Sequence, residues 1–331
     1  MNTNVIAFLL TDRCNASCDI CCFQCNPKNR FVMDAETIRA CMREAAQMGT
    51  VKRFSFTGGE AMLYPELLID LISYGKREFG IPSTLVSNGF WATDYEKGRK
   101  IASRLKDAGL VEVKLSADRF HQRFVPIQAV KNAIRILLEL NIDVPVSVMD
   151  TGRHDIIRET LEQLRPEIYG TKVVYYPLFL TEQMRSTQRT EIVPEDIATP
   201  MPWESIRCPE AGIILLFSDG YMYTCCSQFT FDARRLRIGR IGETPLAEAE
   251  KNANRDPILD MVRRSGPSWL AARAKERGLP VKDRYSCSCE LCYEMLRNEA
   301  FIAEIEPEAR TEAQRLRVER FLKQMSGKSN A

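Results

Sequence analysis

The sequence predicts an α/β fold, a partial (β/α)6 TIM-like barrel that is followed by a small cysteine-bearing domain and a terminal helix. Three observations predict it: strand-like and helix-like segments alternate up to about residue 180, a Pro-bearing break and a cysteine-bearing region follow, and the last segment is charged and periodic. Strands that alternate with helices pair in parallel, because parallel strands need crossover connections. Six βα units are too few for the eight-fold barrel and fit an open, partial one.

Apolar runs of strand length recur along the first part of the chain. The predicted strands are Val5–Leu10, Arg53–Phe56, Ser83–Ser87, Val111–Leu115, Asp143–Val148 and Lys172–Tyr176. The predicted helices are Ala35–Met48, Glu66–Phe79, a segment opened by the capping-box pair Thr93 and Glu96 and closed near Gly109, Ile127–Leu140 and Asp155–Leu164. In such folds chemistry belongs at the carboxyl ends of the strands.

The alternation breaks at Ile192–Trp203, "IVPEDIATPMPW", which predicts a domain boundary. We therefore expect a core domain over residues 1–195, an auxiliary domain over 196–300 and a terminal helix with a tail over 301–331. The charged, periodic segment Glu308–Met325 predicts an amphipathic helix that packs on the body of the protein.

Composition excludes several classes of partner. The 331 residues carry 46 Lys and Arg against 44 Asp and Glu, a formal charge of +2, so no global field favours nucleic acid or an anionic membrane. The first apolar run has six residues, too few for a signal peptide or a membrane span, so we expect a cytoplasmic protein.

Twelve cysteines and only two histidines limit the metal chemistry. In a reducing cytosol, thiols are more often metal ligands or reactive groups than disulfide partners. Mixed Cys/His sites are scarce options here, so zinc bound by four cysteines or iron–sulfur clusters are favoured.

Five cysteines fall within "TDRCNASCDICCFQC", Thr11–Cys25, directly after the first predicted strand. Cys14, Cys18 and Cys21 have the spacing C-x3-C-x2-C. Three thiolates on one loop can hold three irons of a [4Fe–4S] cluster and leave the fourth iron open, as a catalytic site requires. The alternative is a zinc site completed by Cys22 or Cys25.

Further polar motifs end the next three strands: "SFTGGE" (Ser55–Glu60), "SNGF" (Ser87–Phe90) and "LSADRFH" (Leu115–His121). Each alone is typical of a tight turn or a strand-end cap. In order after the cysteine loop, they resemble the radical S-adenosylmethionine (SAM) superfamily.

That resemblance implies a catalytic mechanism. SAM would chelate the open iron, and its reductive cleavage would give methionine and a 5′-deoxyadenosyl radical that abstracts hydrogen from the substrate. Gly58 and Gly59 would allow close backbone approach, and Glu60 would pair with the SAM ammonium. The candidates for the SAM ribose, the SAM carboxylate or the substrate are Ser87, Asn88, Ser116 and Asp118. Ile20 would contact adenine or anchor the loop.

A second cysteine group follows the predicted boundary. "CPEAGIILLFSDGYMYTCC" has the spacing C-x11-G-x4-C, and Asp219–Gly220 suits a hairpin turn. It resembles the start of a SPASM or twitch domain. With "CSCELC", the resemblance implies one auxiliary [4Fe–4S] cluster in a twitch-like domain, ligated by Cys208, Cys225, Cys289 and Cys292. Cys287 could replace Cys289, and a structural zinc site with the same thiolates is the alternative. Cys41 lies within a predicted helix and is expected in the core.

Cys226, directly after a predicted ligand, is a candidate catalytic residue, because a thiol can give a hydrogen atom to a carbon radical. Over most of the first 295 residues the motifs resemble epipeptide-type radical SAM peptide epimerases. In those enzymes the second cysteine of the CC pair quenches a Cα radical and converts an L- to a D-residue. One position departs: where the relatives carry Asp, this sequence has Gly212, with Glu210 two residues earlier.

We therefore expect a radical SAM enzyme that epimerises a ribosomally made precursor peptide and takes electrons from a donor such as flavodoxin or ferredoxin. The alternatives are a thioether or carbon–carbon crosslinking enzyme, a small-molecule dehydrogenase or mutase of the same superfamily, and a non-catalytic zinc- or cluster-stabilised binding protein. Because the first strand starts at Val5, no separate leader-binding domain is expected before it.

Overall fold

The computed structural model describes residues 2–150, 153–179, 201–208, 212–227, 229–231 and 233–327. Most of the predicted boundary at Ile192–Trp203 lies outside these residues, as does Glu210, so the division into domains stays a prediction.

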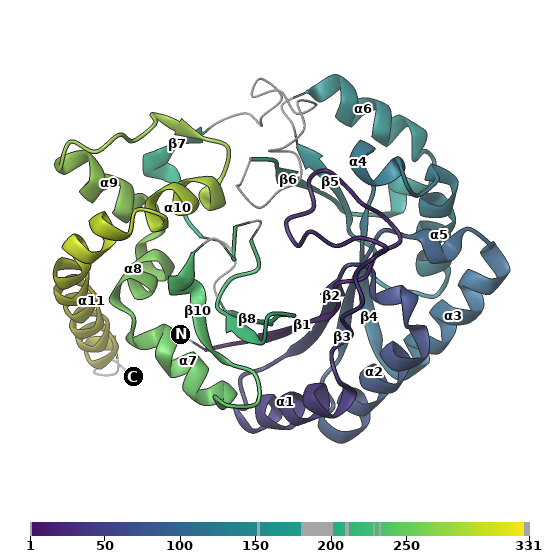
Figure 1. Cartoon of the computed structure of the whole chain (residues 1–331), viewed down its shortest axis with the longest axis horizontal. Helices are drawn as coiled ribbons and strands as arrows, with labels where there is room; N and C mark the ends of the chain where they lie inside the picture. Colours follow the sequence, from purple (N-terminus) through teal and green to yellow (C-terminus); the bar gives the residue numbers. More distant parts are fainter. Residues whose placement is uncertain are drawn as a thin grey trace.

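The α/β fold with a partial barrel is confirmed. One nine-stranded sheet has the order β10-β9-β8-β1-β2-β3-β4-β5-β6 and curls around the centre of the molecule, with β6 and β10 at its two edges (Figure 1). Neighbours from β1 to β6 pair in parallel. The strands are β1 (Val5–Thr11), β2 (Arg53–Gly58), β3 (Ser83–Ser87), β4 (Leu110–Ser116), β5 (Val146–Asp150), β6 (Val173–Pro177), β8 (Ile213–Leu216), β9 (Tyr221–Tyr223) and β10 (Arg237–Arg240), and a separate two-stranded sheet pairs β7 (Met201–Pro202) with β11 (Arg284–Tyr285).

Helices cover the outside of the curled sheet (Figure 1). The α-helices are α1 (Ala35–Gln47), α2 (Pro65–Phe79), α3 (Tyr95–Ala108), α4 (Arg119–Gln122), α5 (Ile127–Glu139), α6 (His154–Gln163), α7 (Leu246–Arg255), α8 (Pro257–Ser265), α9 (Ser268–Glu276), α10 (Ser288–Leu296) and α11 (Glu299–Gly327). Short 3-10 turns are η1 (Ala61–Leu63), η2 (Phe90–Ala92), η3 (Glu167–Gly170), η6 (Trp203–Ser205) and η7 (Arg234–Leu236). Cys41 is buried in α1, as predicted.

Three predicted boundaries are corrected by local chemistry. The cap of α3 is Asp94, which accepts the Lys97 N–H, whereas the Thr93 hydroxyl donates to the Phe90 carbonyl. Strand β5 begins three residues later than predicted, at Val146. Helix α11 begins at Glu299, nine residues before the predicted periodic segment Glu308–Met325, and continues through Pro307.

The second half of the chain extends the sheet of the first half. Strand β8 pairs in parallel with β1, from Val5 opposite Ile213 to Phe8 opposite Leu216. Strands β8 and β9 form the predicted antiparallel hairpin, and β10 adds to it. Strand β1 is buried almost throughout, and both faces of the sheet pack where β8 pairs with it. On one face Ile6, Phe8 and Ile214 belong to the barrel core. Ala7, Leu215 and Tyr223 belong to a second core with α8–α11.

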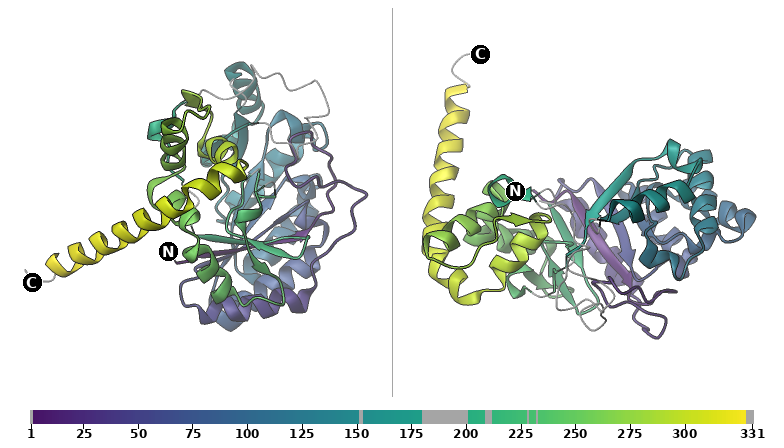
Figure 2. Two further views of the ribbon diagram at one scale, coloured as in Figure 1. Left: turned by 60° about the vertical axis from the view of Figure 1, so that its left-hand side comes forward. Right: turned by 90° about the horizontal axis from the view of Figure 1, so that it is seen from above.

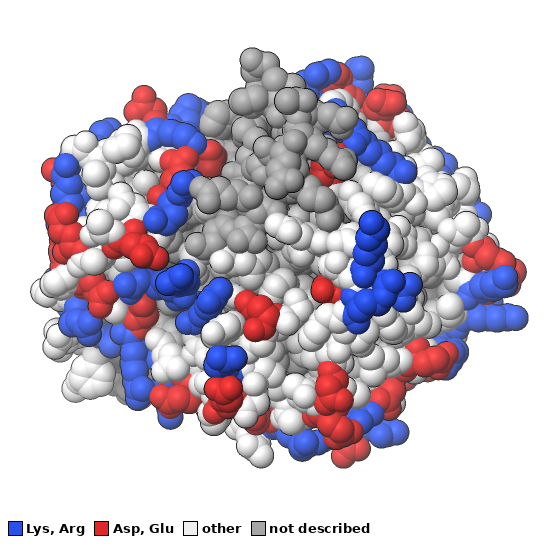
Figure 3. Space-filling view, in the orientation of Figure 1, with Lys and Arg blue, Asp and Glu red and all other residues white. Residues whose placement is uncertain are grey.

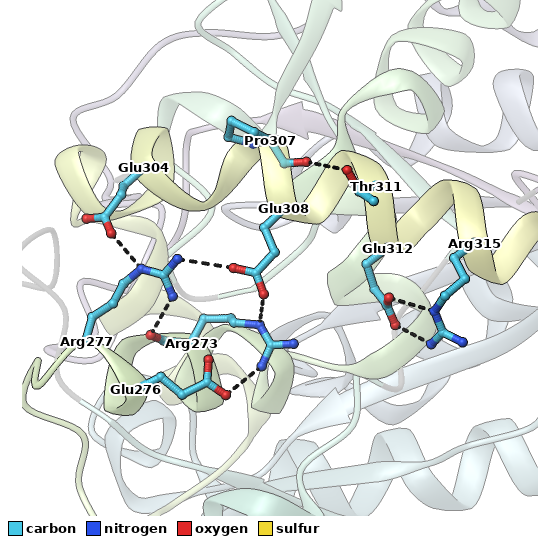
Figure 4. Close-up of polar contacts among 9 residues, drawn as sticks. All are labelled: Arg273, Glu276, Arg277, Glu304, Pro307, Glu308, Thr311, Glu312 and Arg315. Carbon is cyan, nitrogen blue, oxygen red and sulfur yellow. Dashed lines mark hydrogen bonds and ion pairs between the residues drawn. The ribbon is translucent and has the colours of Figure 1, made fainter.

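Ion pairs hold the first half of α11 against the body of the protein. Arg277 donates to Glu304 at 2.7 Å and to Glu308 at 3.1 Å, and Arg273 pairs with Glu308 (Figure 4). Farther along the helix, Arg317 pairs with Asp260 at 2.8 Å. Beyond Arg317 the end of α11 projects away from the body (Figure 2). The prediction that this helix packs on the body therefore holds as far as Arg317.

No helix within the described ranges is both long and apolar enough to cross a membrane. On the face seen in Figure 3, cationic and anionic side chains are interspersed, in keeping with the small net charge.

Candidate active site and second thiol group

A cavity of about 250 Å³ lies at the carboxyl ends of the parallel strands. The loop after β1 and the ends of β2 to β6 contribute its walls. The lining includes nine residues predicted from the sequence, namely Cys14, Cys18, Ile20, Cys21, Gly58, Gly59, Ser87, Asn88 and Ser116. Tertiary structure thus brings the four predicted motifs into one cavity, and the two remaining cofactor candidates, Glu60 and Asp118, are not in this lining.

The cysteine loop is short and well anchored. Cys14 N–H donates to the Asn26 carbonyl at 3.1 Å, and Ala16 N–H donates to Cys14 Sγ at 3.4 Å. A hydrogen bond with Cys21, burial and the charge of Cys14 raise the pKa of Cys25. The neighbouring thiols therefore disfavour the Cys25 thiolate. A bound cation would reverse this, because metal coordination deprotonates a thiol. Three thiols on one wall of a cavity fit a cluster with an open iron, and Cys25 lies beside them.

Gly58 and Gly59 let the end of β2 pack closely against the start of the cysteine loop. A Cβ on Gly58 would lie 2.3 Å from the Thr11 carbonyl oxygen, and one on Gly59 would lie 2.2 Å from that of Arg13. Gly59 N–H donates to the Thr11 carbonyl at 2.7 Å. Any larger residue would push the end of β2 away from the cysteine loop.

Glu60 lies behind the lining, with 1% of its surface exposed. Its carboxylate accepts the Asn88 N–H at 2.8 Å, the Met62 N–H at 3.0 Å and the Ser87 hydroxyl at 3.0 Å. Burial raises the pKa of Glu60 to about 7, although these hydrogen bonds and the charge of His121 oppose the shift. The carboxylate thus holds Ser87 and Asn88 in the cavity wall.

Asp118 acts similarly on His121. Its carboxylate caps α4 by accepting the Phe120 N–H at 3.0 Å, and it contacts His121 Nδ1 at 2.9 Å. Burial lowers the pKa of His121, but the charges of Asp118, Cys21 and Glu60 outweigh it and raise that pKa overall. His121 lines the cavity, so the motif "LSADRFH" contributes a held imidazole as well as Ser116.

Three lining residues, Val86, Met149 and Tyr176, lie outside the predicted motifs. Met149 belongs to β5 and Tyr176 to β6, and Tyr176 accepts a 2.7 Å hydrogen bond from the Lys114 ammonium. Their position near the carboxyl ends of predicted strands was the available signal.

The second thiol group assembles from three separate segments of chain. The pKa of Cys292 is raised first by burial and then by the charges of Cys225, Cys208 and Cys289. Burial and the charges of Cys289 and Cys208 likewise raise the pKa of Cys225 to about 12. The four predicted ligands therefore lie near one another. Among the described residues, no three His, Cys, Asp or Glu side chains converge closely enough to hold a single metal ion as they stand.

Cys287 and Cys289 lie side by side at the start of α10. A hydrogen bond with Cys289 is the main cause that lowers the pKa of Cys287 to about 7, and the Ser286 hydroxyl also donates to Cys287 Sγ at 3.8 Å. Cys289 interacts with both Cys225 and Cys292, which favours it over Cys287 as the fourth member of the group.

An aromatic cluster joins the two thiol groups. Phe23, on the first cysteine loop, lies with its ring centroid 5.6 Å from that of Phe217 and 5.5 Å from that of Phe231. Phe217 and Phe231, which precede and follow Cys226 in the sequence, stack with their ring centroids 3.8 Å apart. Cys226 is close enough to Cys22 for their charges to interact, and Cys22 lines the cavity.

The backbone conformation at Gly212 explains why this chain lacks the aspartate that the resembling epimerases carry at that position. Gly212 has φ +118°, and its carbonyl accepts the Asn4 N–H at 2.9 Å. A Cβ there would lie 3.0 Å from Asn4 Oδ1. An aspartate at this position would be strained, so this chain cannot present a carboxylate there in the same backbone conformation.

Comparison with known proteins agrees with this geometry. The family model "Radical SAM superfamily" matches residues 8–165. YydG of Bacillus subtilis (strain 168), a protein named for a role in peptide biosynthesis, is 28% identical over 300 residues, covering 88% of this chain and 92% of the relative. A GTP 3′,8-cyclase of Campylobacter jejuni (strain RM1221) is 26% identical over 157 residues, covering 44% of this chain and 46% of the relative.

Among solved structures, native anSMEcpe with bound AdoMet and Cp18Cys peptide superimposes with a TM-score of 0.54 at 14% identity, covering 95% of this chain and 99% of that one. At this identity the likeness concerns the fold. Membership of the family implies SAM and one [4Fe–4S] cluster, and three thiols beside an open cavity suit both. Residues 8–165 therefore form a radical SAM domain, which is the catalytic part of this enzyme.

Proposed function

We propose that this enzyme modifies a ribosomally synthesised peptide by inverting a Cα centre from L to D, with Cys226 as the hydrogen-atom donor. The observation that carries the proposal is the position of Cys226. It lies close enough to Cys22, a residue of the cavity wall, for their charges to interact, and its neighbour Cys225 belongs to the second thiol group. A peptide substrate is supported by YydG, which is named for peptide biosynthesis, and by the peptide bound to anSMEcpe, although the latter likeness is one of fold.

The cavity residues have distinct proposed roles. Cys14, Cys18 and Cys21 hold the [4Fe–4S] cluster, which with SAM supplies a 5′-deoxyadenosyl radical when both are bound. Ser87, Asn88 and Ser116 offer hydrogen bonds to SAM, and Ile20 covers the adenine. Glu60 and Asp118 act through the residues that they hold, because their carboxylates already accept several hydrogen bonds.

The second thiol group is proposed to bind an auxiliary [4Fe–4S] cluster through Cys208, Cys225, Cys289 and Cys292. Four thiols that lie near one another, with Cys292 buried and the other three half-buried, and that repel one another as thiolates are suited to a cationic centre. A zinc ion would satisfy the same donors, and metal content separates the two.

The proposed reaction balances in hydrogen. The L-residue loses its Cα hydrogen to the adenosyl group, and the Cα radical takes a hydrogen atom from Cys226 on the opposite face. The S–H bond of Cys226 breaks, the new Cα–H bond forms, and the product has the mass of the substrate. Each turnover would take two electrons from a donor such as flavodoxin or ferredoxin: one for the reductive cleavage of SAM, and one that, with a proton, restores the thiol.

The test is to incubate the reconstituted enzyme with peptides encoded by small reading frames beside its gene, and to analyse mass and chirality together. We expect an unchanged mass and a D-residue after hydrolysis. A product lighter by two hydrogens, with L-residues only, would contradict epimerisation and support a crosslinking enzyme.

A further inference from the structure

One buried hydroxyl has no partner and lies in the second thiol group. Ser227 is 9% exposed, and its Oγ makes no hydrogen bond among the described residues. Five other side chains in the described part of the chain carry such an atom, and they are Thr50, Ser83, Glu167, Trp269 and Arg273. Only Ser227 is within two residues of a cysteine of that group. A buried polar atom without a partner costs free energy, so its position requires an explanation.

The local backbone fixes where this hydroxyl lies. Ser227 N–H donates to Cys225 Sγ at 3.4 Å, and the Ser227 carbonyl accepts the Thr230 hydroxyl at 2.8 Å. Thr230 is fully buried. A hydrogen bond with Cys287 and burial raise the pKa of Cys289, and the nearby Ser227 side chain opposes that shift. The Ser227 Oγ itself does not reach Cys289 with the geometry of a hydrogen bond.

A hydroxyl can rotate its proton toward any acceptor within reach. Neutral thiols are weak acceptors, whereas a metal-bound thiolate is anionic and accepts a stronger, charge-assisted hydrogen bond. The Ser227 hydroxyl therefore lacks a good partner while the cysteines are protonated, and it gains one when they bind a metal centre.

We propose that the Ser227 hydroxyl donates a hydrogen bond to the Cys289 sulfur of the auxiliary cluster and thereby raises the reduction potential of that cluster. The inference rests on the proposed auxiliary cluster. Reduction adds negative charge to the sulfurs of a cluster, so a donor stabilises the reduced form more than the oxidised form.

The first thiol group offers an internal contrast. Cys14 Sγ also accepts the N–H of the second residue after it, at the same 3.4 Å, but that residue is Ala16. The two groups thus share the amide contact and differ in the hydroxyl. Ser227→Ala converts the second arrangement into the first.

The experiment uses the full chain with Cys14, Cys18 and Cys21 replaced by Ala, so that only the auxiliary cluster remains. We would measure its midpoint potential by redox titration followed by EPR, and the exchangeable deuterons near the reduced cluster by ENDOR in heavy water. Ser227→Ala should shift the potential to a more negative value and remove one deuteron coupling. Ser227→Thr, which keeps the hydroxyl, should retain both. Ser83→Ala removes an equally buried, partnerless hydroxyl on β3 and should change neither.

The outcomes separate the two levels of the proposal. If the triple variant binds no iron, or binds zinc only, the auxiliary cluster and the role of Ser227 both fail. If iron binds but Ser227→Ala leaves the potential and the deuteron couplings unchanged, only the role of Ser227 fails. If Ser227→Ala takes up no iron, the test rests on Ser227→Thr. If Ser227→Thr binds iron but lacks the wild-type potential or the deuteron coupling, the proposed hydrogen bond is overturned.

Discussion

The two thiol groups differ in how the chain builds them. The first is local: Cys14, Cys18 and Cys21 lie on one loop after β1 and line a cavity. The second draws four cysteines from three segments, and Cys225, Cys289 and Cys292 belong to or pack against the core around α8–α11. An open site with room for a ligand suits catalysis, whereas an enclosed site ties separate segments together.

Because the two thiol groups are built differently, we expect the first to serve catalysis and the second to serve stability. The walls of the first group come from the loop after β1 and the ends of five strands, β2 to β6, so its geometry depends on the barrel as a whole. The second group draws cysteines from beside the hairpin β8–β9 and from α10, so a metal centre bound there would stabilise the region that carries Cys226. Removing each group should therefore break a different property.

The largest effect is expected from Cys14, Cys18 and Cys21 replaced together by Ala. Reductive SAM cleavage should be abolished, and iron should fall from about eight to about four per chain, because only one of two [4Fe–4S] clusters is lost. The measurements are 5′-deoxyadenosine formation and iron and sulfide content. Cleavage of SAM by this variant would refute the assignment of the catalytic cluster.

Cys292→Ala should show the opposite pattern. We expect it to lose the auxiliary irons and to lower the melting temperature by several degrees, since metal binding at such sites contributes to folding free energy. SAM cleavage should persist at the first cluster. Cys41→Ala, which removes a buried thiol that packs in the barrel core and belongs to neither group, is the matched control and should keep all the iron. Retention of eight irons in Cys292→Ala would exclude Cys292 as a ligand.

Glu60 tests how the first site is held. Burial raises its pKa from 4.5 to about 7, so the folded state retains a proton that the unfolded chain releases. The stability from this residue is therefore present below about pH 4.5 and is lost as the pH rises through about 7, a loss of up to about 3 kcal/mol. Glu60→Gln should remove this slope from unfolding free energies measured against pH. The charge of His121 acts on the pKa of Glu60. Glu60→Gln in a His121→Gln background therefore shows whether the pH dependence of the unfolding free energy comes from Glu60 alone.

Phe23 joins the two regions, and Phe23→Ala should have the smallest of these effects. Loss of its contacts with Phe217 and Phe231 should cost about 1–3 kcal/mol beyond the effect of Phe23→Leu, which keeps much of the apolar volume. Both clusters should remain, while the ratio of modified peptide to 5′-deoxyadenosine should fall, because Cys226 is no longer held against the cavity. An unchanged ratio would show that this cluster of rings does not couple the two regions.

The sequence predicted what local patterns encode. Alternating segments identified the strands of the barrel, and motifs at strand ends share one edge of a parallel sheet, so nine predicted residues meet in the cavity. The pairing of β8 with β1 joins segments about 200 residues apart and left no local signal. The carboxylates of Glu60 and Asp118 turn toward backbone and hydroxyl donors, which only tertiary structure brings within reach. The sequence around Ser227 likewise gives no sign that its hydroxyl is buried without a hydrogen-bond partner among the described residues.

The central claim is that Cys226 delivers a hydrogen atom to a substrate carbon, and turnover in heavy water tests it most directly. A thiol exchanges its hydrogen with water, whereas the Cα hydrogen of the substrate does not exchange on this timescale. Wild-type enzyme should therefore place one deuterium at the Cα of each D-residue, and 5′-deoxyadenosine should carry the hydrogen first bound there. Cys226→Ala should still transfer that hydrogen to 5′-deoxyadenosine but form no D-residue. D-residues without solvent deuterium, or normal D-residue formation by Cys226→Ala, would contradict the proposal.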